Sequence, residues 1–336
     1  MRVLVTGGTG FVGSHLIERL IARGAEVRAL VRAGSRREFV ESLGANAATG
    51  DLDDADSLAA ACRDCEIVYH CAARVEFIGT EEEFHRTTVA GTERLLAAAR
   101  SAGVRRFVQI SSCGVYHPDL LTAGVINEFT ESPQPPKWFI YARAKHRAEA
   151  VVREFCKPPM EWVIVRLGYL YGPRNRTMKT YLEPAMASGI MAIVGDGTNE
   201  LALIDVRDVA AAIEMAGTCG EAAGKALIAA PNERVTQREY FAAMADGFGL
   251  PPIKKTVPYS VAFAAGWVGE YLIRKGPTAV VMRRSSIALT GLPQRIDCSF
   301  TQRLLGWEPR IRFASGIRDA FEWYYREYGK PNRASQ

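Results

Sequence analysis

Tyr141 and Lys145 stand four residues apart in the segment YARAK, a spacing that places a phenol and an ammonium on one face of a helix. A lysine cation held beside a phenol favours the phenolate, which lowers the pKa of the tyrosine from its usual value of about 10. Tyr141 could then act as a general acid or base for a carbonyl and its alcohol. Taken alone, the pattern also fits a surface tyrosine with an incidental lysine.

Two serines, Ser111 and Ser112, follow an apolar run that begins at Phe107 and is expected to be a strand. A hydroxyl at that position can donate a hydrogen bond to a substrate oxygen. Polar residues at the end of a strand serve the fold equally often. If the fold brings Ser112 beside Tyr141, the pair could hold and protonate a carbonyl oxygen.

The stretch TGGTGFVG follows an apolar run at the start of the chain and precedes a helical pattern from Ser14 to Ile21. Strand, glycine turn and helix is the arrangement that binds a dinucleotide pyrophosphate. Gly7, Gly10 and Gly13 permit the tight turn and the close approach of backbone to phosphate, and the helix N-terminus offers unpaired N–H groups. The sequence therefore predicts a nicotinamide dinucleotide, whose oxidised ring would lower the pKa of Tyr141 further.

The end of the second expected strand indicates which dinucleotide is bound. NAD-preferring proteins carry an acidic residue there, which binds both ribose hydroxyls. This chain has no acid between Glu26 and Glu38, and it places Arg32, Arg36 and Arg37 in the loop instead. Because a guanidinium fits the oxygens of a 2′-phosphate, the loop predicts NADP(H) rather than NAD(H). A solvated basic loop is the alternative.

Short apolar runs alternate with amphipathic stretches through the first half of the chain. We expect strands at 2–5, 26–31, 67–71, 107–111 and 162–166. We expect helices at 55–62, 81–102 and 141–154. This alternation predicts right-handed crossovers and a parallel sheet, an α/β doubly wound Rossmann fold. Ligands in such folds bind outside the carboxyl ends of the strands, where the residues named above lie.

The regular alternation loosens after residue 173. We expect residues 1–173 to form the dinucleotide-binding domain, with 202–216 returning to it as a strand and a helix. Residues 174–330 are expected to form a smaller mixed lobe that covers the cofactor and binds the substrate.

The composition is that of an ordinary globular protein, with 48% hydrophobic and 24% charged residues among 336. The net charge of +5 is spread along the chain, so nucleic-acid binding is not expected. The 7 cysteines form no regular framework, and Cys62 and Cys65 have no second pair to complete a metal site. With no expected leader segment, we predict a cytoplasmic protein with no metal.

Six motifs occur in the order and spacing of one known family. They are TGGTGFVG, Asp51-Leu52, HCAA at 70–73, SSCGVY at 111–116, YARAK at 141–145 and RLGYLYGPR at 166–174. On these motifs the chain resembles the extended short-chain dehydrogenases/reductases, a group that includes nucleotide-sugar epimerases and dehydratases, dihydroflavonol reductases and 3β-hydroxysteroid dehydrogenases. The resemblance extends over nearly the whole chain, through 195–213 and 304–324.

The resemblance implies roles for particular residues. Ser112, Tyr141 and Lys145 would be catalytic. Cofactor contacts would come from the glycine loop, from the ends of later strands and from the catalytic helix: Gly7, Gly10, Phe11, Val12, Gly13, Arg32, Arg36, Asp51, Leu52, Ala72, Ala73, Tyr141, Lys145, Leu167, Gly168 and Tyr169. Among these, Asp51 would accept a hydrogen bond from the adenine amino group.

Departures from the family's patterns narrow the reaction. Dehydratases of this kind carry an acidic pair after the catalytic serine, where this chain has Cys113 and Gly114. Many nucleotide-sugar enzymes keep a diphosphate-binding arginine where this chain has Leu201, although Arg176 or Arg295 could replace it. Thr88 stands where the family usually has an asparagine that supports the backbone of the site, so we expect a rearranged hydrogen-bond network.

The C-terminal half contains an apolar segment, 261–273, followed by Arg274, Lys275, Arg283 and Arg284. This layout looks like the 3β-hydroxysteroid dehydrogenase and ketone reductase branch, in which such a segment covers an apolar substrate or rests on a membrane. A helix that packs on the core of its own lobe is the alternative.

We therefore expect an NADP(H)-dependent oxidoreductase that interconverts a ketone and a secondary alcohol on a bulky, sterol- or lipid-like substrate. The alternatives are a nucleotide-sugar epimerase with the same catalytic residues and a sensor that binds NADP(H) without turnover. The expected partners are a small-molecule substrate, a second copy of the chain joined through the helices at 81–102 and 141–154, and a lipid surface at 261–275.

Overall fold

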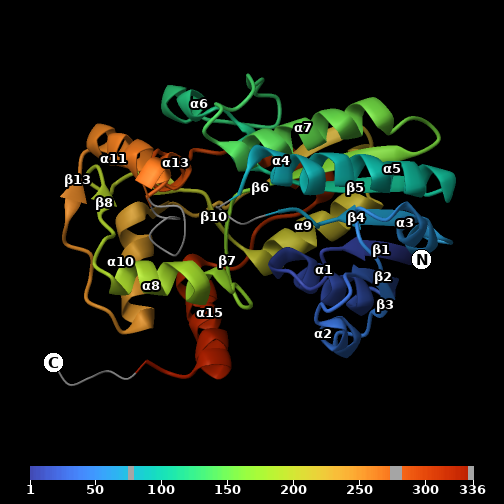
Figure 1. The fold of residues 1–336 in the computed structure, drawn as a ribbon, viewed down its shortest axis with the longest axis horizontal. Helices are drawn as coiled ribbons and strands as arrows, with labels where there is room; N and C mark the ends of the chain where they lie inside the picture. Colours follow the sequence, from blue (N-terminus) through green and yellow to red (C-terminus); the bar gives the residue numbers. More distant parts are fainter. Residues whose placement is uncertain (75–78, 273–281, 332–336) are drawn as a thin grey trace.

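The computed structural model describes residues 1–74, 79–272 and 282–331. Within these residues a seven-stranded parallel sheet forms the centre, in the order β11-β6-β5-β4-β1-β2-β3 (Figure 1). The strands are β1 (Arg2–Thr6), β2 (Glu26–Val31), β3 (Asn46–Thr49), β4 (Ile67–His70), β5 (Arg106–Ser112), β6 (Glu161–Leu167) and β11 (Lys225–Ala229). Because the strand order reverses between β1 and β4, their carboxyl ends form the crevice in which such folds bind ligands.

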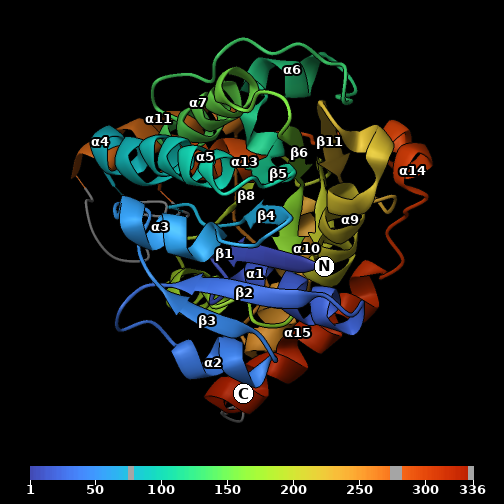
Figure 2. The same ribbon diagram turned by 90° about the vertical axis from the view of Figure 1, so that its right-hand side faces the viewer.

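Helices cover both faces of the sheet, as its apolar strands require. On one face Val3 and Val5 pack with Leu16, in a core shared by α1 (Phe11–Ala22) and α9 (Val206–Thr218). On the other face Leu4 packs with Leu58, in a core shared by α3 (Ala55–Cys62), α5 (Gly91–Ser101) and α7 (Ile140–Phe155). Figure 2 shows α3, α5 and α7 together on that side. The predicted doubly wound fold is confirmed.

The predicted long helix at 81–102 is helical but not uniform. It consists of α4 (Glu81–Phe84), a π-helical stretch at His85–Ala90 and α5. A π-helical turn accommodates one extra residue, which a 3.6-residue pattern does not register. Thr88 lies in this turn, and its carbonyl accepts a hydrogen bond from the Thr92 hydroxyl at 2.6 Å.

The remaining elements are shorter. The helical ones are α2 (Arg37–Ser42), a 3-10 turn at Cys113–Val115, α6 (Pro118–Ala123), a π-helical turn at Met178–Leu182, α8 (Glu183–Ala187), a 3-10 turn at Gly220–Ala222, α10 (Gln237–Phe248), α11 (Tyr259–Leu272), α13 (Arg284–Gly291), α14 (Ser299–Leu305) and α15 (Phe313–Tyr328). The short strands are β7 (Tyr169–Tyr171), β8 (Ile193–Val194), β9 (Glu200–Leu201), β10 (Leu203–Asp205), β12 (Val235–Thr236) and β13 (Thr256–Val257).

The division of the chain predicted from the sequence needs two corrections. Strand β11, from the part assigned to the smaller lobe, joins the central sheet beside β6. Strand β10, expected in that sheet, pairs with β7 instead. The cause lies at Gly168, whose N–H donates to the Ala229 carbonyl while the N–H of Tyr169 donates to the Ala202 carbonyl. The chain therefore leaves the sheet at this glycine, and β11 occupies the edge.

None of the helices described over 1–74, 79–272 and 282–331 is long and apolar enough to cross a membrane. The apolar segment predicted at 261–273 forms α11, and its end at Ile273, with Arg274 and Lys275, lies outside the described residues.

Candidate functional site

One large cavity, of about 1410 Å³, lies at the carboxyl ends of the central strands. It brings together almost all the residues predicted from the sequence. These lining residues are Gly7, Gly10, Phe11, Val12, Gly13, Arg32, Arg36, Asp51, Leu52, Ala72, Ala73, Ser112, Tyr141, Leu167, Gly168 and Tyr169. Lys145 is the exception, because it is buried behind the wall with only 3% of its surface exposed.

The glycine loop is shaped so that side chains cannot replace its hydrogens. A Cβ on Gly13 would lie 2.3 Å from the Gly7 carbonyl oxygen, and one on Gly7 would lie 2.8 Å from the Ala72 nitrogen. Gly7 also has a φ of 71°, a conformation that favours glycine. Gly10 caps α1 without any side-chain hydrogen bond, so the first N–H groups of the helix face the cavity. This cradle fits the pyrophosphate of a dinucleotide.

Ser112 and Tyr141 meet in the wall of the cavity, where β5 ends and α7 begins. The Ser112 side chain is hydrogen-bonded to the Tyr141 phenol, and its oxygen accepts the N–H of Gly114 at 3.1 Å. Burial raises the pKa of Tyr141 to about 12, although the Ser112 hydrogen bond opposes this. Without the cofactor, burial therefore decides the pKa of Tyr141, and the predicted lowering by Lys145 and an oxidised nicotinamide together stays a prediction.

Lys145 lies one helical turn after Tyr141 and supports strand β5. Its ammonium donates a hydrogen bond of 2.7 Å to the carbonyl of Ile110. Burial lowers its pKa to about 8, while Cys71 and Glu149 counteract this shift. Lys145 is thus a buried cation just behind the two hydroxyls.

Ser111 serves the fold and not the cavity. Its hydroxyl donates 2.6 Å to the Glu149 carboxylate, which also accepts 2.9 and 2.7 Å hydrogen bonds from Arg166. Arg166 in turn donates 2.8 Å to the Tyr116 hydroxyl. Burial opposes ionisation of Glu149, but Arg166 and Ser111 hold its pKa below the usual value. Glu149 was missed in the sequence, although it follows Lys145 at helical spacing.

A buried chain of hydrogen bonds runs behind the glycine loop. The Ala72 N–H donates to the Thr6 hydroxyl at 3.2 Å, which lies 2.7 Å from His70 Nδ1; His70 Nε2 lies 3.1 Å from the Thr92 hydroxyl. Because Thr92 donates onward to the Thr88 carbonyl, Nε2 carries the imidazole proton and Nδ1 accepts. The Arg74 N–H also donates to the Thr88 hydroxyl. These hydrogen bonds form the network around Thr88, the position at which the family usually has an asparagine.

We expect His70 to make the protein sensitive to acid. Burial, and then the charge of Lys145, lowers its pKa to about 3, against 6.5 in an unfolded chain. Between these values the unfolded state binds one more proton, so His70 reduces the free energy of unfolding by about 1.4 kcal/mol for each pH unit lost. Urea titrations from pH 6 to pH 4 give the slope of the free energy of unfolding against pH. His70→Asn should reduce this slope by about 1.4 kcal/mol for each pH unit.

The matched control is His85→Asn, which removes an exposed imidazole and should leave the slope as in the wild type. An unchanged slope in the His70 variant would show that this imidazole is protonated in the folded protein.

The loop after β2 places two of its three arginines at the cavity. Arg36 donates 3.2 Å to the Thr9 carbonyl and lies 4.3 Å from the centre of the Phe39 ring. Burial and then the charge of Arg176 lower the pKa of Arg36. Arg37 instead pairs with Glu41 at 2.8 Å and does not line the cavity. Ser35 and Arg176 also line the cavity, and neither was predicted from the sequence to contact the cofactor.

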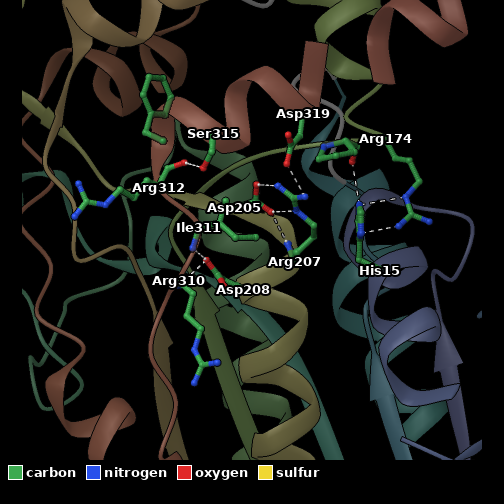
Figure 3. Close-up of polar contacts among 12 residues, drawn as sticks. His15, Arg174, Asp205, Arg207, Asp208, Arg310, Ile311, Arg312, Ser315 and Asp319 are labelled. Atoms are coloured by element: carbon green, nitrogen blue, oxygen red, sulfur yellow. Dashed lines mark hydrogen bonds and ion pairs between the residues drawn. The ribbon is translucent and has the colours of Figure 1, made fainter. Parts of the chain in front are cut away.

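Polar contacts hold the cofactor-side helix α1 to the segment that follows β7 (Figure 3). His15 lies 3.0 Å from the Pro173 carbonyl and accepts 2.6 Å from Arg174. Burial and then Arg174 lower the pKa of His15 to about 4, so it bonds as a neutral imidazole. Nearby, Arg207 pairs with Asp205 at 2.9 Å and with Asp319 of α15 at 2.8 Å. These contacts fix the segment that follows β7 relative to helix α1 and the glycine loop.

The part of the cavity beyond Tyr141 is lined mainly by apolar side chains. They come from α6, from the loop before α7, from the segment before β8, from helices α10, α11 and α13 and from the residue two before α13: Pro118, Leu121, Trp138, Phe139, Ile190, Met191, Phe241, Val261, Ala262, Ala265, Ile287, Leu289 and Met282. Such walls suit a bulky apolar molecule whose reactive oxygen points to Ser112 and Tyr141.

The residues at which the chain departs from the dehydratase and nucleotide-sugar patterns differ in whether they line the cavity. Leu201 is 2% exposed in the core around Tyr240 and does not line the cavity. Cys113 does line it, but burial raises the pKa of its thiol far above neutrality. Arg295 pairs with Glu200 at 3.9 Å and lies outside the lining.

Comparison with known proteins agrees with this geometry. The model of the NAD dependent epimerase/dehydratase family matches residues 3–228. The chain is 30% identical to 4-hydroxy-2-methyl-3-oxo-4-farnesyl-3,4-dihydroquinoline-1-oxide ketoreductase of Stigmatella aurantiaca, over 94% of this chain and 95% of that one. It is 26% identical to 2-alkyl-3-oxoalkanoate reductase of Stenotrophomonas maltophilia, over 95% and 98%. It is 28% identical to the decarboxylating sterol-4-alpha-carboxylate 3-dehydrogenase of Dictyostelium discoideum, over 64% and 66%.

Solved structures show the same architecture. The protein gox2253 superimposes with a TM-score of 0.79 at 28% identity, over 98% of this chain and 99% of that one. MoeE5 in complex with UDP-glucose and NAD gives a TM-score of 0.73 at 25% identity, over 97% and 99%.

Proposed function

The chain belongs to the NAD-dependent epimerase/dehydratase family, and from this premise we propose that it is an NADP(H)-dependent oxidoreductase interconverting a ketone and a secondary alcohol on a bulky, largely apolar substrate. The observation that carries the proposal is a single cavity in which Ser112 and Tyr141 lie between a glycine cradle and apolar walls. The names of the ketoreductase and sterol dehydrogenase relatives agree with this reaction.

The residues divide the chemistry between them. The nicotinamide, when bound, supplies or accepts the hydride at the carbon. Tyr141 gives its proton to the carbonyl oxygen during reduction and takes it from the alcohol during oxidation. Ser112 donates a hydrogen bond to the same oxygen. The positive charges of Lys145 and of an oxidised nicotinamide would offset the burial that raises the pKa of Tyr141.

The runner-up is a nucleotide-sugar epimerase, to which the likeness to MoeE5 with UDP-glucose and NAD points. The buried Leu201 weighs against a diphosphate substrate; of the two arginines that could replace the missing one, Arg295 lies outside the described lining and Arg176 lines the cavity. Two of the relatives are named for substrates that carry a carboxylate on the carbon next to the reacting one. Spectrophotometric assays distinguish the two functions, because reduction of a long-chain ketone consumes NADPH and epimerisation of UDP-glucose consumes none.

We expect Arg32 to select NADPH over NADH. Arg32 is exposed at the cavity and forms no ion pair with the described parts of the chain, so its guanidinium is available to a 2′-phosphate. Arg32→Met should raise the Kd for NADPH by about 10- to 100-fold and that for NADH by less than about threefold. Fluorescence titration with each dinucleotide measures both constants.

Arg37→Met is the matched control, since Arg37 pairs with Glu41 on the same loop. It should change neither constant. Equal losses for the two dinucleotides in Arg32→Met would contradict a role for this loop in reading the 2′-phosphate.

Further features complete the proposal. We place the cofactor domain at residues 1–173 with α9 and β11 added, and the substrate lobe in the rest of 174–330. A homodimer would form through α4, α5 and α7, in the cytoplasm. The outer side of α11, with Trp267, Tyr271 and Leu272 exposed, would meet a lipid surface.

A further inference from the structure

Arg283 is a cation without a partner on the substrate side of the cavity. It immediately precedes α13 and lines the cavity. Its side chain makes no hydrogen bond or ion pair with any residue in 1–74, 79–272 or 282–331, and its Nε is fully buried without an acceptor. Leaving a buried guanidinium N–H unsatisfied is unfavourable, so the geometry calls for an acceptor supplied by a ligand.

The neighbouring Arg284, unlike Arg283, is paired within the described part of the protein. Arg284 donates 3.0 and 2.6 Å hydrogen bonds to Glu270, and its guanidinium lies 5.6 Å from the Trp138 ring. Trp138 lines the cavity three residues before Tyr141. The start of α13 is thereby fixed beside the start of the catalytic helix. Arg283 therefore belongs to the substrate end of the cavity, not to the adenosine end where Arg36 lies.

The charged side chains described at the substrate end of the cavity are positive. Among the described lining residues from Thr177 onward, Lys255 and Arg283 are the cations and Glu327 is the sole acid. Glu327 lies near enough to Arg36 for its charge to oppose the lowering of the pKa of Arg36, and so it lies at the adenosine end. The substrate end thus combines apolar walls with positive charge, a combination that fits an apolar molecule carrying one anionic group.

We propose that Arg283 binds a carboxylate carried by the substrate, so that the protein acts on apolar 3-oxo and 3-hydroxy acids. The planar guanidinium matches a carboxylate with two parallel hydrogen bonds. This assignment rests on the proposed function, and it adds the group by which one ketone is chosen over another. Arg283 positions the acid, while Ser112 and Tyr141 act on the neighbouring oxygen.

The test compares a long-chain 2-alkyl-3-hydroxy acid with its methyl ester, which has one methyl group in place of the negative charge. Calorimetry gives the Kd of each compound for the NADP(H)-loaded protein, and absorbance at 340 nm gives kcat/KM for its oxidation. Arg283→Met should weaken binding of the acid at least about tenfold and leave the ester within about twofold. Arg283→Lys keeps the positive charge and should restore part of the preference for the acid over the ester.

Arg295→Met, which removes an arginine outside the cavity lining, should leave both compounds unaffected. Equal effects of Arg283→Met on acid and ester would overturn the carboxylate assignment and leave the reductase intact. Loss of UDP-glucose binding with no change for the acid would overturn it as well. If the wild type oxidises neither compound, the proposed reaction fails, and the binding constants alone still decide whether Arg283 holds a carboxylate.

Discussion

Replacing Tyr141 with phenylalanine is expected to lower kcat for ketone reduction by about 100- to 10,000-fold, the contribution typical of a positioned general acid. A phenyl ring keeps the packing of α7 against the cavity but has no proton to give. Ser112 would still hold the oxygen, so KM should change by less than about threefold. Steady-state kinetics with NADPH and a bulky ketone measure both constants.

The same variant should bind NADPH within about threefold of wild type, because the glycine cradle does not depend on the phenol. Tyr271→Phe, which removes an exposed hydroxyl of α11, is the control and should retain full activity. Retention of more than a tenth of the activity in Tyr141→Phe would remove Tyr141 from the proposed mechanism.

Replacing Gly13 with alanine is expected to remove cofactor binding almost entirely. The added Cβ would lie 2.3 Å from the Gly7 carbonyl oxygen, so the loop must move away from α1. Such overpacking should lower the free energy of unfolding by about 1–3 kcal/mol. A shift of about 1 Å in the cradle suffices to raise the Kd for NADPH by about 100-fold or more.

Gly220→Ala is the matched control, since nothing lies within 4 Å of a Cβ at that position. It should bind NADPH like the wild type. Isothermal titration measures the constants, and thermal unfolding shows that each variant folds. Near-normal NADPH binding by folded Gly13→Ala would mean that the pyrophosphate lies elsewhere.

The cofactor half of the site was predictable because its residues lie at strand ends within short motifs. Gly7, Gly10 and Gly13 are set by backbone geometry alone, and Ser112 and Tyr141 follow from the periods of one strand and one helix. Parallel strands align their carboxyl ends, so residues far apart in the sequence converge without any need to know the packing.

The parts that were not predictable depend on tertiary packing. The pKa of Tyr141 rises because burial exceeds any effect of Lys145, and a sequence does not give burial. The edge position of β11 and the π-helical turn at Thr88 reflect where the chain leaves the sheet and where one extra residue is accommodated. Arg283 stood beside Arg284 in the sequence with nothing to separate them, and only Glu270 and Trp138 show which one is paired.

The most direct measurement of the central claim follows the hydride. The protein would be incubated with NADPH carrying deuterium at both C4 positions and with a panel of long-chain ketones that includes a 3-ketosteroid, and the products analysed by mass spectrometry. The proposed function predicts a secondary alcohol with one deuterium on the carbinol carbon for each NADPH oxidised. Epimerisation of UDP-glucose by the same protein, with no NADPH consumed and no deuterium in any alcohol, would contradict it.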